Sequence, residues 1–263
     1  MRQKPKKSLG QNFLNDKYIL NLISKLGSVN NKSIILEIGP GTGNLTEKLL
    51  EQKPKKLFLI EKDKNLYNDL KNKFINKVEV INDDFLNFDI GDFFKEKITI
   101  FGNLPYNISS QILIKLIRLK NLEKKIYKLI FMFQKEVADR IIANENSKQY
   151  GRLSIISSWK LDVKKITDVD PNSFYPKPKV KSTILIMEPK KKYLKLKSPK
   201  NLEHITNVFF NLRRKKIKKP LKILFKNYEE IANLLMIDLN LRPQNLSPSI
   251  FLKICLEYEK LTN

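Results

Sequence analysis

Short apolar runs alternate with helix-patterned segments over the first half of the chain, and this alternation constrains the fold more than any other feature. The five runs with the length and composition of buried strands are residues 33–38, 57–61, 78–81, 98–101 and 129–133. The segments that repeat apolar residues at helical spacing are 16–26, 44–51, 63–74, 109–119 and 135–143. Strands that alternate with helices at this interval predict an α/β fold with a doubly wound, mostly parallel, Rossmann-like sheet.

The pattern changes in the last third of the chain. Two further strand candidates, 163–166 and 182–187, have no evident helix between them, so one of them is expected to run antiparallel. The segments that then follow the helical period are 202–212, 228–236 and 247–256. The sequence therefore predicts a sheet domain over 1–188 and a small, basic, all-helical domain over 189–263.

The charge balance points to a polyanionic partner. The 263 residues carry 51 Lys and Arg against 27 Asp and Glu, which gives a net charge of +24 and favours nucleic-acid binding. The alternative is that Lys, at 44 residues against 7 Arg, reflects an AT-rich coding sequence without a binding role.

The rare residue types exclude several other classes of protein. One Cys and one His exclude a disulfide framework and a cysteine or histidine cluster for a metal, so no metal is predicted. No apolar run approaches the roughly 18 residues that span a bilayer. We expect a cytoplasmic protein with no membrane partner.

A glycine-rich turn follows the first predicted strand. In Glu37–Gly43, Gly39 and Gly41 permit a tight turn and a close approach of the backbone to a ligand. Glu61 ends the next strand, where a carboxylate can accept both hydroxyls of a ribose. The turn lacks one residue of the dinucleotide fingerprint and the Lys-Ser/Thr of a P-loop, which argues against NAD and ATP.

A third polar position follows the third predicted strand. Asp84 can accept a hydrogen bond from an adenine amino group, and Phe85 can pack beside the ring. Taken alone, Asp84 also fits an ordinary turn or a helix cap. Together with the glycine turn and Glu61 at successive strand ends, it fits S-adenosylmethionine as the cofactor.

The segment Asn103–Tyr106 after the fourth strand has the residues to handle an adenine amine. That amine is a weak nucleophile because its lone pair is delocalised, so two acceptors aimed at its hydrogens favour attack. The side chain of Asn103 and the carbonyl of Leu104 supply such acceptors, Pro105 stiffens the turn, and Tyr106 can stack on the purine. A paired base must be flipped out or lie in a loop to reach such a site. The alternative is an ordinary Asn/Pro turn.

A second aromatic residue lies in a basic, proline-rich loop. Phe174 can form the other side of a base clamp, with Lys177 and Lys179 near the phosphates, or it can be a core anchor for the turn. Two basic runs, 177–200 and 213–226, favour RNA phosphate contact, and the alternative for each is a solvated surface.

At this point the sequence resembles the ribosomal RNA adenine dimethyltransferase family, and its small-subunit, kasugamycin-sensitivity branch in particular. The resemblance runs nearly end to end, and its most specific motifs are Ser8–Leu14 and Asn103–Ser109. Its other motifs are Glu37–Gly43, Gln134–Val137, Tyr150–Ser154 and Phe174–Val180, with Ser182 after the last. The resemblance implies two methyl groups on N6 of each of two adjacent adenosines, in a hairpin loop near the 3′ end of 16S rRNA.

The resemblance also implies roles for individual residues and for partners. The positions expected to contact the cofactor or the amine are Gln11, Asn12, Leu14, Gly39, Gly41, Glu61, Asp84 and Asn103, and Tyr106 and Phe174 would sandwich the adenine. Arg213, Arg214 and Lys215 resemble C-terminal elements of the branch, and with Lys216 they are expected to bind rRNA. The expected partner is small-subunit rRNA in an assembling 30S-type particle, bound by a monomer. The chain does not align clearly over 215–241.

Two other enzymes and one binding role remain as alternatives. The large-subunit rRNA branch more often has Ile where this chain has Leu104, and DNA adenine methyltransferases usually have a second Pro there. A non-catalytic assembly factor with the same fold is the alternative from another class. Intact Asn103, Tyr106 and Glu61 favour retained catalysis.

Overall fold

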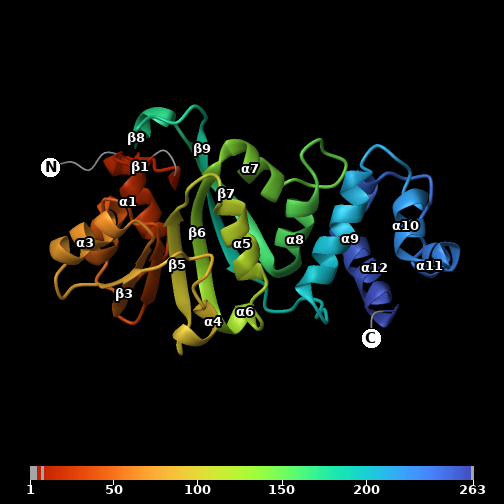
Figure 1. Ribbon diagram of the computed structural model, residues 1–263, viewed down its shortest axis with the longest axis horizontal. Helices are drawn as coiled ribbons and strands as arrows, with labels where there is room; N and C mark the ends of the chain where they lie inside the picture. Colours follow the sequence, from red (N-terminus) through yellow and green to blue (C-terminus); the bar gives the residue numbers. More distant parts are fainter. Residues whose placement is uncertain (1–4, 7–8, 262–263) are drawn as a thin grey trace. The chain divides into compact units, whose positions relative to one another are not determined.

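The computed structural model describes residues 5–6 and 9–261, and the chain divides into two compact units (Figure 1). Unit 1 consists of Met1–Ala138 and Asp162–Pro189, and unit 2 consists of Asp139–Leu161 and Lys190–Asn263. No helix in the described part of the chain is long and apolar enough to cross a bilayer.

Unit 1 is built on a seven-stranded sheet of order β4-β3-β2-β5-β6-β9-β7. Its strands are β2 (Ile34–Ile38), β3 (Lys56–Glu61), β4 (Glu79–Asn82), β5 (Ile98–Asn103), β6 (Ile126–Gln134), β7 (Leu161–Val169) and β9 (Ser182–Pro189). The pairs β2–β3, β2–β5, β3–β4 and β5–β6 are parallel, and β9 is antiparallel to β6. The predicted doubly wound, mostly parallel sheet is confirmed, including an antiparallel strand among the two late candidates.

The central strands are buried and mostly apolar because helices cover the sheet. The helices of this unit are α1 (Lys17–Leu26), α2 (Asn44–Glu51), α3 (Lys64–Lys73), α4 (Ile90–Phe93), α5 (Ser109–Ile117) and α6 (Leu122–Lys125). All residues of β2 are buried, as expected for a strand covered on both faces. Asp16 begins α1 by accepting hydrogen bonds from the N–H groups of Tyr18 and Ile19, and Asp63 does the same for Asn65 at α3.

A small second sheet joins the N-terminal segment to the later proline-rich loop. Strand β1 (Phe13–Leu14) pairs antiparallel with β8 (Phe174–Tyr175), which follows a 3-10 turn at Pro171–Ser173. Two residues per strand are too few to show alternation, so the sequence offered no pattern for this pairing. Its consequence is that residues from opposite ends of unit 1 are held side by side.

Unit 2 is helical. Its helices are α8 (Arg152–Lys160), α9 (Pro199–Asn211), α10 (Lys218–Leu224), α11 (Tyr228–Leu234) and α12 (Pro248–Leu261), with a 3-10 turn at Pro243–Asn245. Helix α7 (Lys135–Ile141) crosses the division between the units. The core of unit 2 brings α8, α9 and α12 together, and the rings of Phe209 and Phe251 lie 5.2 Å apart.

The division differs from the sequence prediction of 1–188 and 189–263 in one respect. Residues 139–161 group with the helical unit, although they precede β7 and β9 in the chain. The physical reason is helix α8, which the sequence analysis missed: Ile155 and Ile156 are buried on a helix that contacts α9 and α12. Its apolar residues surround the helix rather than form one stripe, so it lacked the amphipathic pattern that reveals a helix.

Candidate active site

A cavity lies at the carboxyl ends of β2, β3 and β5 in unit 1. Its walls come from the N-terminal segment 9–14, the glycine turn after β2, the end of β3, the segment 83–86 and the turn 103–108. Parallel strands bring these segments to one edge of the sheet, which is where ligands bind in open α/β sheets. The predicted site residues that line it are Gln11, Asn12, Leu14, Gly39, Gly41, Glu61, Asp84, Asn103, Leu104, Pro105 and Tyr106.

The glycine turn has the backbone conformation that the sequence predicted. Gly39 and Gly41 have φ values of +66° and +60°, which side chains disfavour. A Cβ on Gly41 would lie 2.9 Å from the ring of Phe13, whereas a Cβ on Gly39 would meet only Pro105, at 3.9 Å. Gly41 is therefore required for packing against the N-terminal segment, and Gly39 leaves the backbone open toward the cavity.

Glu61 holds the glycine turn to the end of β3. Its carboxylate accepts hydrogen bonds from the N–H groups of Asp63, at 2.9 Å, and Gly41, at 3.2 Å. Burial raises the pKa of Glu61, while these two hydrogen bonds oppose the rise. The group that was predicted to bind a ribose is thus buried and held by backbone donors on both sides.

Asp63 ties the N-terminal segment to this edge, a role that the sequence did not reveal. The ammonium group of Lys6 lies 2.8 Å from one oxygen of Asp63, and the amide of Gln11 donates to the same carboxylate at 3.2 Å. Burial alone would raise the pKa of Asp63, but the hydrogen bonds from Lys6, Asn65 and Gln11 lower it overall. The sequence predicts Asp63 as the N-terminal cap of a helix, and the structure confirms that role beside this second one. Ser8 of the first motif lies outside the described residues.

Glu37 is a second acid of the cavity that sequence reasoning did not assign. It is 2% exposed, and its carboxylate accepts a hydrogen bond from the hydroxyl of Thr46 at 2.7 Å. Burial raises its pKa to about 7, the hydrogen bond from Thr46 opposes the rise, and the charge of Glu61 adds to it. The sequence feature that indicates a role for Glu37 is an acidic residue inside a strand that is otherwise apolar.

Asp84 opens the turn that follows β4. One of its oxygens accepts from the N–H of Leu86 at 2.9 Å, and the other lies 2.8 Å from the ammonium of Lys62. Burial alone would raise the pKa of Asp84, but these contacts lower it overall, so the side chain is a carboxylate at neutral pH. Phe85 is buried and lines the cavity.

The turn after β5 presents Asn103 with a defined orientation. Its side-chain amide donates to the backbone carbonyl of Asn12 at 2.9 Å, so the donor end is held by the N-terminal segment. The oxygen of the same amide is the acceptor that the sequence assigned to an amine. Leu104 is 1% exposed, and its side chain anchors the turn in the core.

The two aromatic residues of the predicted clamp lie in different environments. Tyr106 lines the cavity and is half-buried, and its hydroxyl lies 2.6 Å from the hydroxyl of Ser182 on β9. Phe174 is 5% exposed and packs in the core with Leu14 and Ile184, outside the residues that line the cavity. In this structure Phe174 has the environment of a core anchor, which was the alternative to its role in a clamp.

The predicted RNA-binding residues differ in exposure and in partners. Lys177 and Lys179 are exposed on the loop after β8 in unit 1. In unit 2, the guanidinium of Arg213 donates to the carbonyls of Ser147, Lys148 and Tyr150, and it lies against the ring of Phe210. Arg213 therefore holds the loop before α8 and has few donors left for a phosphate.

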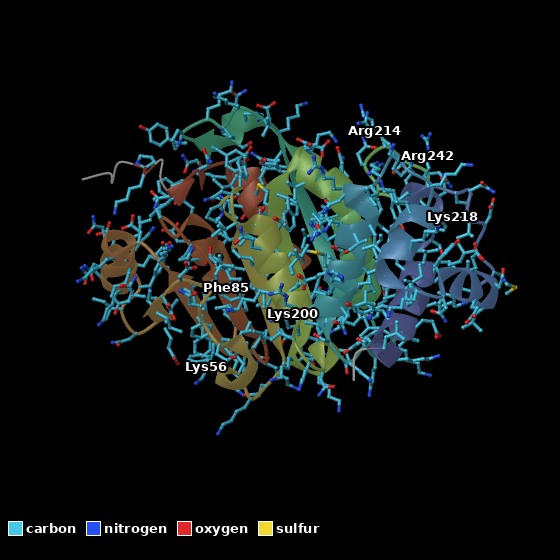
Figure 2. The ribbon with its side chains drawn as sticks, turned by 45° about the vertical axis from the view of Figure 1, so that its right-hand side comes forward. Lys56, Phe85, Lys200, Arg214, Lys218 and Arg242 are labelled. Carbon is cyan, nitrogen blue, oxygen red and sulfur yellow. The ribbon has the colours of Figure 1, made fainter. Side chains whose placement is uncertain are left out.

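The neighbours of Arg213 are available to solvent. Arg214, Lys215 and Lys216 are exposed, and Lys216 donates to the side chain of Asn240 at 2.8 Å. The segment 216–218 lies along 239–241, since Ile217 and Lys218 donate backbone hydrogen bonds to Leu241 and Leu239. Figure 2 shows Arg214, Lys218 and Arg242 projecting from the helical unit. No cluster of three or more metal-ligating side chains is present within residues 5–6 and 9–261.

Comparisons with known proteins agree over nearly the whole chain. The family model of ribosomal RNA adenine dimethylases matches residues 2–260. Relatives named ribosomal RNA small subunit methyltransferase A are 52% identical in Pelagibacter ubique and 40% identical in Francisella tularensis subsp. novicida. These matches cover 98% of this chain and 98% of the first relative, and 96% of this chain and 97% of the second.

Solved structures of similar proteins share the architecture. A dimethyladenosine transferase from Plasmodium falciparum superposes with a TM-score of 0.77 at 29% identity, over 94% of this chain and 98% of its own. The 23S rRNA methyltransferase ErmE has a TM-score of 0.68 at 22% identity, and the match covers 95% of this chain and 100% of ErmE. This likeness concerns the fold alone. The fold and the pocket at its strand ends define a Rossmann-like, S-adenosylmethionine-dependent methyltransferase. Within that class, the chain belongs to the ribosomal RNA adenine dimethylase family.

Proposed function

We propose that this protein transfers two methyl groups to N6 of each of two adjacent adenosines, in a hairpin loop near the 3′ end of small-subunit rRNA. The observation that carries the proposal is the orientation of Asn103, whose amide nitrogen is engaged by Asn12 so that its oxygen can accept from an amine. The branch is supported by the names of the relatives at 52% and 40% identity, which refer to the small subunit.

The cavity fits S-adenosylmethionine in the chemistry of its groups. Glu61 would accept from the ribose, Asp84 from the adenine amino group, and the open backbone at Gly39 would lie along the ligand. Gln11, Asn12 and Leu14 would close the cavity from the N-terminal side. When bound, this cofactor supplies a methyl group that its sulfonium already activates for transfer.

The residues of the chain act on the substrate amine. In the first transfer the Asn103 oxygen and the Leu104 carbonyl would accept the two N–H groups of the amine, and in the second transfer they would accept the one N–H that remains. This would localise the nitrogen lone pair, which forms the new N–C bond as the bond between the methyl carbon and the sulfonium sulfur breaks. The amine then releases one proton to solvent for each methyl group received. Because no strong base is needed, the contribution of the site is positioning, which can lower a barrier by roughly 7–11 kcal/mol.

The aromatic residues would hold the flipped base. Tyr106 lines the cavity and is kept in place by Ser182, so we assign it the stacking face. Phe174 remains the proposed residue on the other side of the adenine, and it is buried before a base enters. Phe174 on β8 pairs with Leu14 on β1. This pairing links the proposed adenine-binding residue to the N-terminal segment that lines the cofactor cavity.

Exposed basic side chains would contact the rRNA backbone. These are Lys177 and Lys179 in unit 1, and Arg214, Lys215 and Lys216 in unit 2, whereas Arg213 would support the loop behind them. We propose that the protein acts as a monomer in the cytoplasm on an assembling 30S-type particle.

The test is methyl transfer from labelled S-adenosylmethionine. The substrates are small subunits that lack the modification, with large subunits and DNA as controls, followed by nucleoside analysis. We expect labelled N6,N6-dimethyladenosine in the small subunit alone. Label in the large subunit or in DNA would identify one of the other two enzyme branches. No label with tight subunit binding would replace catalysis by a structural role in assembly.

A further inference from the structure

A lysine behind the cavity contacts the turn that carries Asp84. Lys115 lies on α5, and its ammonium donates hydrogen bonds to the backbone carbonyls of Leu86, at 2.8 Å, and Phe88, at 2.7 Å. The same nitrogen lies 5.5 Å from the ring centroid of Phe85, which is labelled in Figure 2. One side chain therefore holds three parts of the segment 85–88.

The turn itself is organised around Asp84. The carboxylate of Asp84 accepts from the N–H of Leu86, and its carbonyl accepts from the N–H groups of Asn87 and Phe88. Asp84, Phe85 and Leu86 line the cavity, whereas Lys115 does not. Lys115 thus contacts the turn without lining the cavity.

The helix that carries Lys115 also forms part of the cavity wall. Ile112, one turn earlier on α5, lines the cavity and is fully buried. The two hydrogen bonds of Lys115 therefore fix the distance between α5 and the Asp84 turn, which are two walls of one pocket. Burial lowers the pKa of Lys115, and the nearby carboxylates of Asp89, Asp84 and Asp83 oppose this without reversing it.

We propose that Lys115 is a positioning residue that sets selectivity for a 6-aminopurine at the cofactor site. It places the Asp84 carboxylate where it accepts from an amino group and rejects a 6-oxo group, whose oxygen has no proton to donate. The inference rests on the proposed function, since it assigns Asp84 to the adenine of the cofactor.

The experiment compares two ligands whose purines carry an amino group or an oxo group at position 6, the 6-oxo form also having a proton on N1. S-adenosylhomocysteine and S-inosylhomocysteine are titrated calorimetrically into the full chain and into Lys115→Met, which keeps an unbranched side chain one atom shorter and removes its donors. We expect Lys115→Met to lose about tenfold of the preference for the adenosyl ligand, which corresponds to about 1.4 kcal/mol. Affinity for the inosyl ligand should change little.

A matched control separates selectivity from stability. Lys125 on α6 also donates to a backbone carbonyl, that of Gly91, and neither residue lines the cavity. Lys125→Met should keep the wild-type preference. If Lys115→Met does not fold, Lys115→Leu, which also lacks hydrogen-bond donors, replaces it under the same criterion.

The outcomes are distinguishable. Equal loss of affinity for both ligands in Lys115→Met, or an unchanged preference, would overturn the role of Lys115 and leave the proposed function standing. A wild-type protein that binds neither ligand would overturn the proposed function itself. Recovery of the preference in Lys115→Arg, which retains donors, would support positioning.

Discussion

The pocket of unit 1 and the basic surface of unit 2 have different physical origins. The pocket depends on backbone conformation and on a few buried groups, each with named partners, such as Glu61 between two N–H donors. The basic surface consists of exposed side chains whose contribution is their summed charge, as at Arg214 and Lys215. Single substitutions in the pocket should therefore abolish methyl transfer, whereas RNA binding by the basic surface should weaken markedly only when several charges are changed together.

Asn103→Ala tests the pocket side of this comparison most directly. We expect methyl transfer to fall by at least about 100-fold, because the amine loses an acceptor aimed at it. Binding of unmethylated small subunits should remain close to wild type. The measurements are single-turnover transfer and co-sedimentation at matched salt.

The control for Asn103→Ala is Asn68→Ala, on the exposed side of α3 and outside the cavity. It should retain both transfer and binding. If Asn103→Ala lost subunit binding in the same proportion as transfer, the assignment of Asn103 to the reacting amine would be incorrect.

Charge reversal on the basic surface should produce the opposite result. The variant changes Lys215, Lys216, Lys218 and Lys219 to Glu. Subunit affinity should fall and its salt dependence should become shallower, by about 0.7 to 0.9 log units per log of salt for each phosphate that the protein no longer neutralises. Transfer at saturating subunit concentration should be retained.

Four exposed lysines of unit 1, Lys32, Lys64, Lys71 and Lys77, provide the matched reversal with the same change in net charge. If both quadruple variants lost equal affinity, only net charge would matter. If neither lost affinity, the lysine excess would have no binding role.

Glu37→Gln probes a buried charge of the pocket through pH. The folded-state pKa of about 7 exceeds the unfolded value of about 4.5, so the contribution of Glu37 to stability is complete below about pH 4.5 and is lost as pH rises through about 7. We expect Glu37→Gln to be more stable than wild type at about pH 8, by up to about 3 kcal/mol, with little difference at about pH 5. Thermal unfolding of both proteins at the two pH values measures this, and a difference independent of pH would contradict it.

Arg213 and Arg214 form a matched pair within the basic surface. Arg213→Ala removes hydrogen bonds to three carbonyls and should destabilise the protein by about 2 kcal/mol. Arg214→Ala should leave the melting temperature unchanged and weaken RNA binding slightly. The measurements are the melting temperature and the RNA affinity of each variant. If Arg213→Ala were as stable as wild type but bound RNA weakly, Arg213 would be a phosphate-binding residue rather than a structural one.

The site could be predicted to the extent that it depends on strand ends. Gly39, Glu61, Asp84 and Asn103 each follow or end a strand that was visible as an apolar run, and the rule for parallel sheets places such positions at one edge. The residues that hold them were not visible. Lys115, Ser182 and Asp63 are distant from their partners in the chain, and each looks like an ordinary helix, strand or cap residue.

The sequence by itself determined the α/β sheet, the cavity at its carboxyl edge and the family, because hydrophobic periodicity and motif spacing are local properties of the chain. Only the tertiary structure decided that Arg213 holds a loop, that Phe174 is buried and that residues 139–161 join the helical unit. These outcomes depend on interactions between residues far apart in sequence, and local patterns carry no information about which distant groups satisfy a donor or cover an apolar face.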